Sequence, residues 1–232
     1  MDAILTPKAV ALPEQAAKDL VAEANHRIAN SLTLLVSMVR MQASAAARRS
    51  EVLTAAEVRL MLEGVAARIS TIGQLHRLLS HVPQDGCTNL MPHLRDVSDA
   101  LVAALSSPQQ TVTVEYSGND CLVLTRQVQP IILIICEVFI NAMKYAHPAG
   151  VPLVMQMDCT PSADGRLVLS ISDDGVGLPE GFDPTTQGGL GFRVIRSLAS
   201  EIGATLEVTS TSLGLSFRLS MPGSAMPSGR PS

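Results

Sequence analysis

His26 and the residues around it have the types and the spacing that could hold and deprotonate an imidazole. Glu23 stands three residues before it and Asn30 four residues after it, so the three side chains share one face of a helix. A carboxylate beside an imidazole can orient the ring and accept its proton. The spacing therefore indicates a nucleophilic histidine, and the alternative is an ordinary exposed histidine on a surface helix.

A second group of polar residues lies on a segment that is otherwise apolar. Glu137, Asn141, Lys144 and Tyr145 follow one another at intervals of three and four residues, which places them on one face of a helix. Polar groups on a buried helix need polar partners. The stripe therefore indicates either a ligand site or a satisfied network of buried hydrogen bonds.

Two glycine clusters follow further along the chain. Asp173 ends an expected strand, and Gly175 and Gly177 after it permit a tight turn and close approach of a ligand to the backbone. The Asp173 carboxylate can accept a hydrogen bond from an exocyclic amine. Gly189 and Gly191 precede an expected helix, whose free N–H groups can bind phosphate. Either cluster alone also fits an ordinary turn, hinge or helix cap.

The first part of the chain is expected to form a helical hairpin. Apolar periodicity predicts one helix from Pro13 to about Ala47 and a second from Ser50 to Val82, interrupted only by Arg68. The apolar seam of such a pair exceeds what two helices can bury. Either a second copy of the chain covers it, giving a four-helix bundle, or the chain's own C-terminal half does. We favour the second copy, a homodimer.

After Cys87 the pattern changes to mixed helices and strands, which predicts a sheet covered on one face by helices, an α/β sandwich. The expected helices span 91–105, 127–145 and 191–202, and the expected strands span 112–116, 152–157, 166–172, 205–210 and 216–221. The overall fold class is α+β. We divide the chain into a tail (1–12), the hairpin (13–86), the sandwich domain (87–221) and a disordered tail rich in Pro, Ser and Gly (222–232).

Composition excludes some partners. The 232 residues carry a net charge of −4, with two Tyr, four Phe and no Trp, so we expect no binding to nucleic acid. The four cysteines lack a metal-binding spacing and are expected to be buried thiols in a reducing compartment. The sequence has no signal-peptide pattern and no apolar run near the length of a membrane span. We therefore expect a cytoplasmic protein without a membrane anchor. A separate sensor protein is a further expected partner.

The segment Glu23-Ala-Asn-His26-Arg-Ile-Ala-Asn30 resembles the phosphoacceptor segment of the HWE histidine kinases and their HRxxN-type relatives. The three later clusters, in their order and spacing, resemble the GHKL (Bergerat) ATP-binding fold over roughly residues 90–221. The resemblance implies that ATP and Mg²⁺ are the cofactors and that His26 is phosphorylated, with Glu23 and Asn30 beside it. It also implies a nucleotide site, for which we name Asn141, Lys144, Tyr145, Asp173, Gly175, Gly177, Gly189, Leu190 and Gly191, with Asn141 and Glu137 as magnesium ligands.

The expected function is that of an ATP-dependent protein-histidine kinase, which phosphorylates His26 and passes the phosphoryl group to an aspartate of a response-regulator receiver domain. Leu215 stands where the GHKL fold usually has Thr. One alternative is a histidine phosphotransferase or scaffold of a phosphorelay with a degenerate ATP domain. A less favoured alternative is a protein-serine kinase of the anti-sigma type.

Overall fold

The computed structural model describes residues 29, 32–33, 35–37, 39–40, 43–44, 46–47, 52–79, 86–106, 111–118, 120–148, 151–184 and 186–223. His26, Glu23 and Asn30 lie outside these residues, as do the predicted tail 1–12 and positions 224–232. The predictions for those segments therefore stay predictions.

The helical hairpin is present. The described residues between Ala29 and Ala47 are helical, and helix α2 spans Ala55–Leu79. A capping box starts α2: the backbone N–H of Glu57 donates to Thr54 Oγ1 at 3.2 Å, and that of Thr54 donates to Glu57 Oε2 at 2.9 Å. Our expected start at Ser50 is therefore wrong, since Thr54 is the residue that caps the helix.

The second half of the chain contains a five-stranded mixed sheet in the order β2-β4-β5-β7-β6. Its strands are β2 (Val112–Gly118), β4 (Leu153–Pro161), β5 (Arg166–Asp173), β6 (Thr205–Thr211) and β7 (Gly214–Pro222). β2 and β4 are parallel, and the other neighbours are antiparallel. The sequence prediction missed β1 (Cys87–Asn89) and β3 (Leu122–Leu124), which pair with each other. Three residues are too few to show a period of two.

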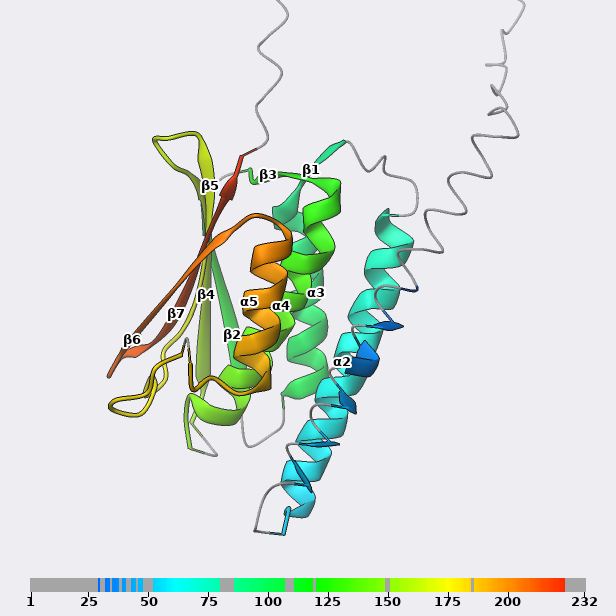
Figure 1. Ribbon diagram of the computed structural model, residues 1–232, viewed down its shortest axis with the longest axis vertical. Coiled ribbons are helices and arrows are strands. Elements are labelled where there is room, and N and C mark those ends of the chain that lie inside the picture. Colours follow the sequence, from blue (N-terminus) through cyan, green and yellow to red (C-terminus); the bar gives the residue numbers. More distant parts are fainter. Residues whose placement is uncertain are drawn as a thin grey trace, which may run out of the picture.

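Three helices cover one face of the sheet: α3 (Leu90–Leu105), α4 (Thr125–Tyr145) and α5 (Leu190–Glu201). Figure 1 shows α2 and the helical pieces beside it forming a further layer outside α3 and α4. Among the described residues, α4 is the one helix long and apolar enough to cross a membrane, and 78% of its apolar window is buried inside the fold. The predicted α+β class, a hairpin followed by an α/β sandwich, is confirmed.

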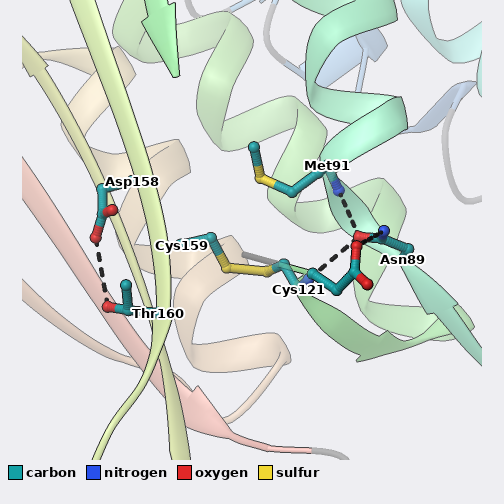
Figure 2. The surroundings of a disulfide bond; sticks show 7 residues. Asn89, Met91, Cys121, Asp158, Cys159 and Thr160 are labelled. Carbon is teal, nitrogen blue, oxygen red and sulfur yellow. Dashed lines mark hydrogen bonds between the residues drawn. A yellow bond between two sulfur atoms is a disulfide. The ribbon is translucent and has the colours of Figure 1, made fainter. Parts of the chain in front are cut away.

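The cysteines differ from expectation. Cys121 and Cys159 form a disulfide, with their Cα atoms 6.0 Å apart, that joins the start of β3 to β4 (Figure 2). Cys87 is exposed, and of the four cysteines only Cys136 is, as we expected, a buried thiol outside a disulfide. The pairing was not visible in the sequence because the two residues are 38 positions apart, on elements whose proximity only the folded sheet creates.

Candidate active site

The predicted polar residues of the second half open into one cavity of about 900 Å³. Its wall includes all four members of the α4 stripe, together with Asp173 and Gly177 after β5 and Gly189 and Gly191 at the start of α5. Gly175 lies beside this wall rather than in it, and the side chain of Leu190 is not among those described. Residues far apart in the chain therefore line one cavity, and their roles in a nucleotide site stay a prediction.

The α4 stripe is graded in burial from one end to the other. Glu137 is buried, Asn141 and Lys144 are partly buried, and Tyr145 is exposed. Burial lowers the pKa of the Lys144 ammonium, the positive charge of Arg68 lowers it further, and the charge of Glu137 opposes both. The stripe thus brings a desolvated cation and an amide to the cavity.

Asp173 is held by the backbone that surrounds it. Its Oδ1 accepts hydrogen bonds from the N–H of Gly175 at 2.9 Å and from the N–H of Leu215 at 3.3 Å. Burial raises the pKa of the Asp173 carboxyl, and these two bonds oppose the rise. Because Leu215 supports Asp173 through its main chain, this contact does not depend on having Thr at that position.

The glycines after β5 allow the loop to pack closely. A Cβ on Gly175 would lie 2.5 Å from the Ala146 Cα at the end of α4. Gly177 has φ +72°, and a Cβ there would lie 2.2 Å from the carbonyl oxygen of Thr211. Gly175 is therefore a packing residue that brings the loop against α4, whereas Gly177 lies in the wall itself.

The glycines before α5 leave the helix start open. Gly189 is the N-cap residue, and no side chain caps the first turn, so the first N–H groups of the helix remain available to an anion. Gly191 lies against the amide of Asn141, since a Cβ on it would be 2.8 Å from Asn141 Nδ2.

Replacing Gly191 by alanine should therefore separate stability from ligand binding. Alanine favours a helix over glycine by about 1 kcal/mol, whereas the new methyl group would push Asn141 away from its present position. We expect an unchanged or higher melting temperature and an approximately tenfold loss of ATP affinity, measured by calorimetry. Ser197→Ala, on the exposed side of α5, is the control that should change neither. An unchanged affinity in Gly191→Ala would show that the position of Asn141 does not matter.

Sequence reasoning missed a buried ion pair at this site. Arg68 of α2 has 2% of its surface exposed. Its Nε donates to Glu137 Oε1 at 2.5 Å, and its Nη2 donates to Glu137 Oε2 at 2.8 Å. The signal was present, because Arg68 is the residue that interrupts the apolar periodicity of its helix.

The donor set fits magnesium bound together with a polyphosphate. Among the described residues no three His, Cys, Asp or Glu side chains form a metal cluster. Magnesium needs none, since it usually takes one or two protein oxygens and completes its shell with phosphates and water. Asn141 offers such an oxygen, and its buried Nδ2 makes no hydrogen bond to the described protein. Both oxygens of Glu137 accept from Arg68.

Comparison with known families accounts for both halves of the chain. The family described as "Histidine kinase" matches residues 23–105, and the family described as "Histidine kinase-, DNA gyrase B-, and HSP90-like ATPase" matches residues 126–225. The chain thus joins a segment similar to the histidine kinase family to a segment similar to the ATPase family. The first match includes the segment around His26, and the second includes the cavity residues of α4, the loop after β5 and α5.

Individual relatives agree with these two matches. The chain is 28% identical over 212 residues to "Blue-light-activated histidine kinase 2" of Erythrobacter litoralis, covering 87% of this chain and 56% of that one. It is 27% identical over 184 residues to "Sensor histidine kinase PdtaS" of Mycobacterium tuberculosis, covering 78% of this chain and 34% of that one. The chain thus spans about half the length of the first relative and a third of the second.

A solved structure supports the fold. The histidine kinase domain of a blue-light activated histidine kinase from Erythrobacter litoralis superposes with a TM-score of 0.64 at 24% identity, covering 88% of this chain and 93% of that one. At this identity the likeness concerns the arrangement of helices and strands.

Proposed function

We propose that this protein is a histidine kinase, which phosphorylates its own His26 from Mg-ATP and passes the phosphoryl group to an aspartate of a response-regulator receiver domain. The observation that carries the proposal is the single cavity in which a backbone-held carboxylate, a desolvated lysine, an unpaired amide and an uncapped helix start converge. The family match over residues 23–105 supports His26 as the acceptor.

Each cavity residue has a distinct proposed role. Asp173 accepts a hydrogen bond from the adenine amine. Lys144 and the start of α5 offset the charge of the phosphates, and Asn141 ligates magnesium, which when bound neutralises charge on the transferring phosphoryl group. Glu137, whose two oxygens each accept one hydrogen bond from Arg68, would join Asn141 as a metal ligand through a remaining lone pair. Tyr145 contributes to the open rim of the cavity.

On the hairpin, Glu23 and Asn30 would orient His26, and Glu23 would accept its proton as the nitrogen attacks. Little covalent chemistry is required of the protein in phosphoryl transfer, so catalysis is mainly positioning and electrostatic stabilisation. We place the kinase in the cytoplasm; the Cys121–Cys159 disulfide of the structure is unusual for that reducing compartment. A separate sensor protein would supply its signal.

The test of this function is incubation of the purified protein with ATP labelled at the γ-phosphate. We expect label that is stable to base and lost in acid, as befits a phosphoramidate, and no label in His26→Ala. Acid-stable label would instead indicate a serine kinase. A protein that never labels from ATP, but accepts a phosphoryl group from a phosphorylated receiver, would be a phosphotransferase with a degenerate ATP domain.

We also propose that the kinase is a homodimer through its hairpin. Within the described part of the hairpin, large apolar side chains remain exposed on both helices, among them Leu32, Val36, Leu62 and Ile69. Docking of α2 on the sandwich domain therefore leaves an apolar face that a second copy could cover.

Leu62→Glu should dissociate this dimer. Leu62 is 65% exposed in the single chain, so the charge costs the monomer little, whereas it would be buried at an interface. Light scattering at micromolar concentration should show the mass halved. Leu213→Glu is the matched control, because Leu213 is 83% exposed in the β6–β7 turn. A wild-type monomer under the same conditions would overturn the proposed assembly.

A further inference from the structure

The buried ion pair between α2 and α4 uses only part of the arginine. A guanidinium has five N–H donors in a planar fork, and Glu137 accepts one hydrogen bond from Nε and one from Nη2. Arg68 Nη1 is buried and has no hydrogen-bond partner among the described residues. Gly64, one turn earlier on α2, leaves space for it, since a Cβ there would lie 3.2 Å from Nη1. A buried donor without an acceptor costs about 1–3 kcal/mol, so a purely structural pair would leave this cost uncompensated.

Arg68 also belongs to the wall of the cavity described above, although it comes from the hairpin. Glu137 fixes its position at the start of the α4 stripe, one turn before Asn141 and two turns before Lys144. The Nδ2 of Asn141 is a second buried donor without a described partner. The charges of Arg68 and Lys144 repel each other closely enough to lower the pKa of the lysine.

These groups together are suited to one class of ligand. Two cations and one carboxylate leave this part of the wall with a net positive charge, and two unpaired donors lie in the same wall. A polyphosphate supplies both the negative charge and the acceptor oxygens, and arginine binds phosphate through its planar fork. Adenine supplies neither.

We infer that Arg68 is a nucleotide-contacting residue, whose Nη1 donates to the phosphate chain of ATP while Glu137 holds the other edge of the guanidinium. The inference rests on the proposed function, because it needs ATP in this cavity. It adds that the hairpin carrying the acceptor histidine also completes the phosphate site. Binding of a phosphate-bearing nucleotide therefore stabilises the docked position of α2.

The experiment compares ATP with adenosine, each in EDTA so that no metal contributes. Affinities are measured by competition against a fluorescent ATP analogue. Arg68→Lys keeps the charge and one contact with Glu137 but loses the fork, so ATP should bind about tenfold more weakly or worse, with adenosine unchanged. Arg68→Met/Glu137→Met removes both buried charges together and should lose ATP affinity to a similar or greater extent. Arg59→Lys, at an exposed position of the same helix, is the control.

A second measurement needs no variant. Hydrogen exchange of wild-type α2 around Arg68 should slow more with ATP than with adenosine at equal saturation. The inference is wrong if the ratio of the ATP and adenosine affinities in the Arg68 variants stays as in the wild type, or if both ligands protect α2 equally. Arg68 would then only stabilise the packing of α2 on α4. Tighter ATP binding in the variants would also overturn the inference, and would indicate that the Arg68–Glu137 ion pair hinders ATP from entering the cavity. Failure of the wild type to bind ATP even with magnesium would overturn the proposed function itself.

Discussion

Replacing Asp173 by asparagine should abolish labelling from ATP while leaving the fold intact. The asparagine Oδ1 can still accept from the N–H groups of Gly175 and Leu215, which hold the aspartate now. Its Nδ2 then faces the adenine amine. Both groups are hydrogen-bond donors, whereas in the wild type the amine donates to the Asp173 carboxylate. We expect ATP affinity to fall at least about a hundredfold, because a charged hydrogen bond is lost and a buried donor is left unpaired.

The stability of the same variant should be equal to or higher than that of the wild type at pH 7. Burial raises the pKa of Asp173 in the folded state, so its ionised form is disfavoured by folding. The stability linked to this group is present below the unfolded pKa, about 4, and is lost as pH rises through the higher folded value. Urea unfolding between pH 4 and pH 7 should therefore show asparagine gaining on aspartate as pH increases. A less stable variant at pH 7 would show that the carboxylate charge supports the fold.

Reverse transfer separates the nucleotide site from the acceptor. Asp173→Asn does not change the His26 helix. The variant should therefore still accept a phosphoryl group at His26 from any phosphorylated receiver domain that can transfer one to the wild type. Asn141→Ala should behave in the same way, and His26→Ala should fail in both directions. Label from ATP in His26→Ala would mean that the acceptor is another residue.

Arg68→Met should lower the free energy of unfolding by about 3 kcal/mol, because it leaves the buried carboxylate of Glu137 without its partner. Arg68→Met/Glu137→Met should recover most of this loss, since an apolar pair of similar volume is often as stable as a buried ion pair. Urea unfolding monitored by circular dichroism measures both.

A matched surface pair on the same helix provides the control. Arg59 Nε donates to Glu63 Oε1 at 2.7 Å, and the arginine side chain is 67% exposed. Arg59→Met should cost less than about 0.5 kcal/mol, the usual value of an exposed i,i+4 pair. Equal costs for Arg68→Met and Arg59→Met would show that α2 does not dock on α4 in solution.

The sequence by itself determined the local elements and the chemistry of the clusters. Periods of 3.6 and two located α3, α4, α5 and the long strands within a few residues, because burial of one face dictates the spacing of apolar side chains. The stripe from Glu137 to Tyr145 was recognisable because its polar residues interrupt an otherwise apolar helix. The glycines after Asp173 were recognisable because they directly follow an expected strand. The spacing around His26 and its resemblance to a kinase segment singled out this residue, which stays a prediction because it lies outside the described residues.

Only the tertiary structure decided which distant residues meet. No local pattern could pair Cys121 with Cys159, or Arg68 with Glu137 across 69 positions, because each contact depends on how whole elements pack. The same holds for the support of Asp173 by the main chain of Leu215, which a side-chain motif cannot encode. In the sequence Arg68 was an interruption in an apolar face. Docking of α2 against α4 makes it a buried cation with one edge held and another edge unpaired.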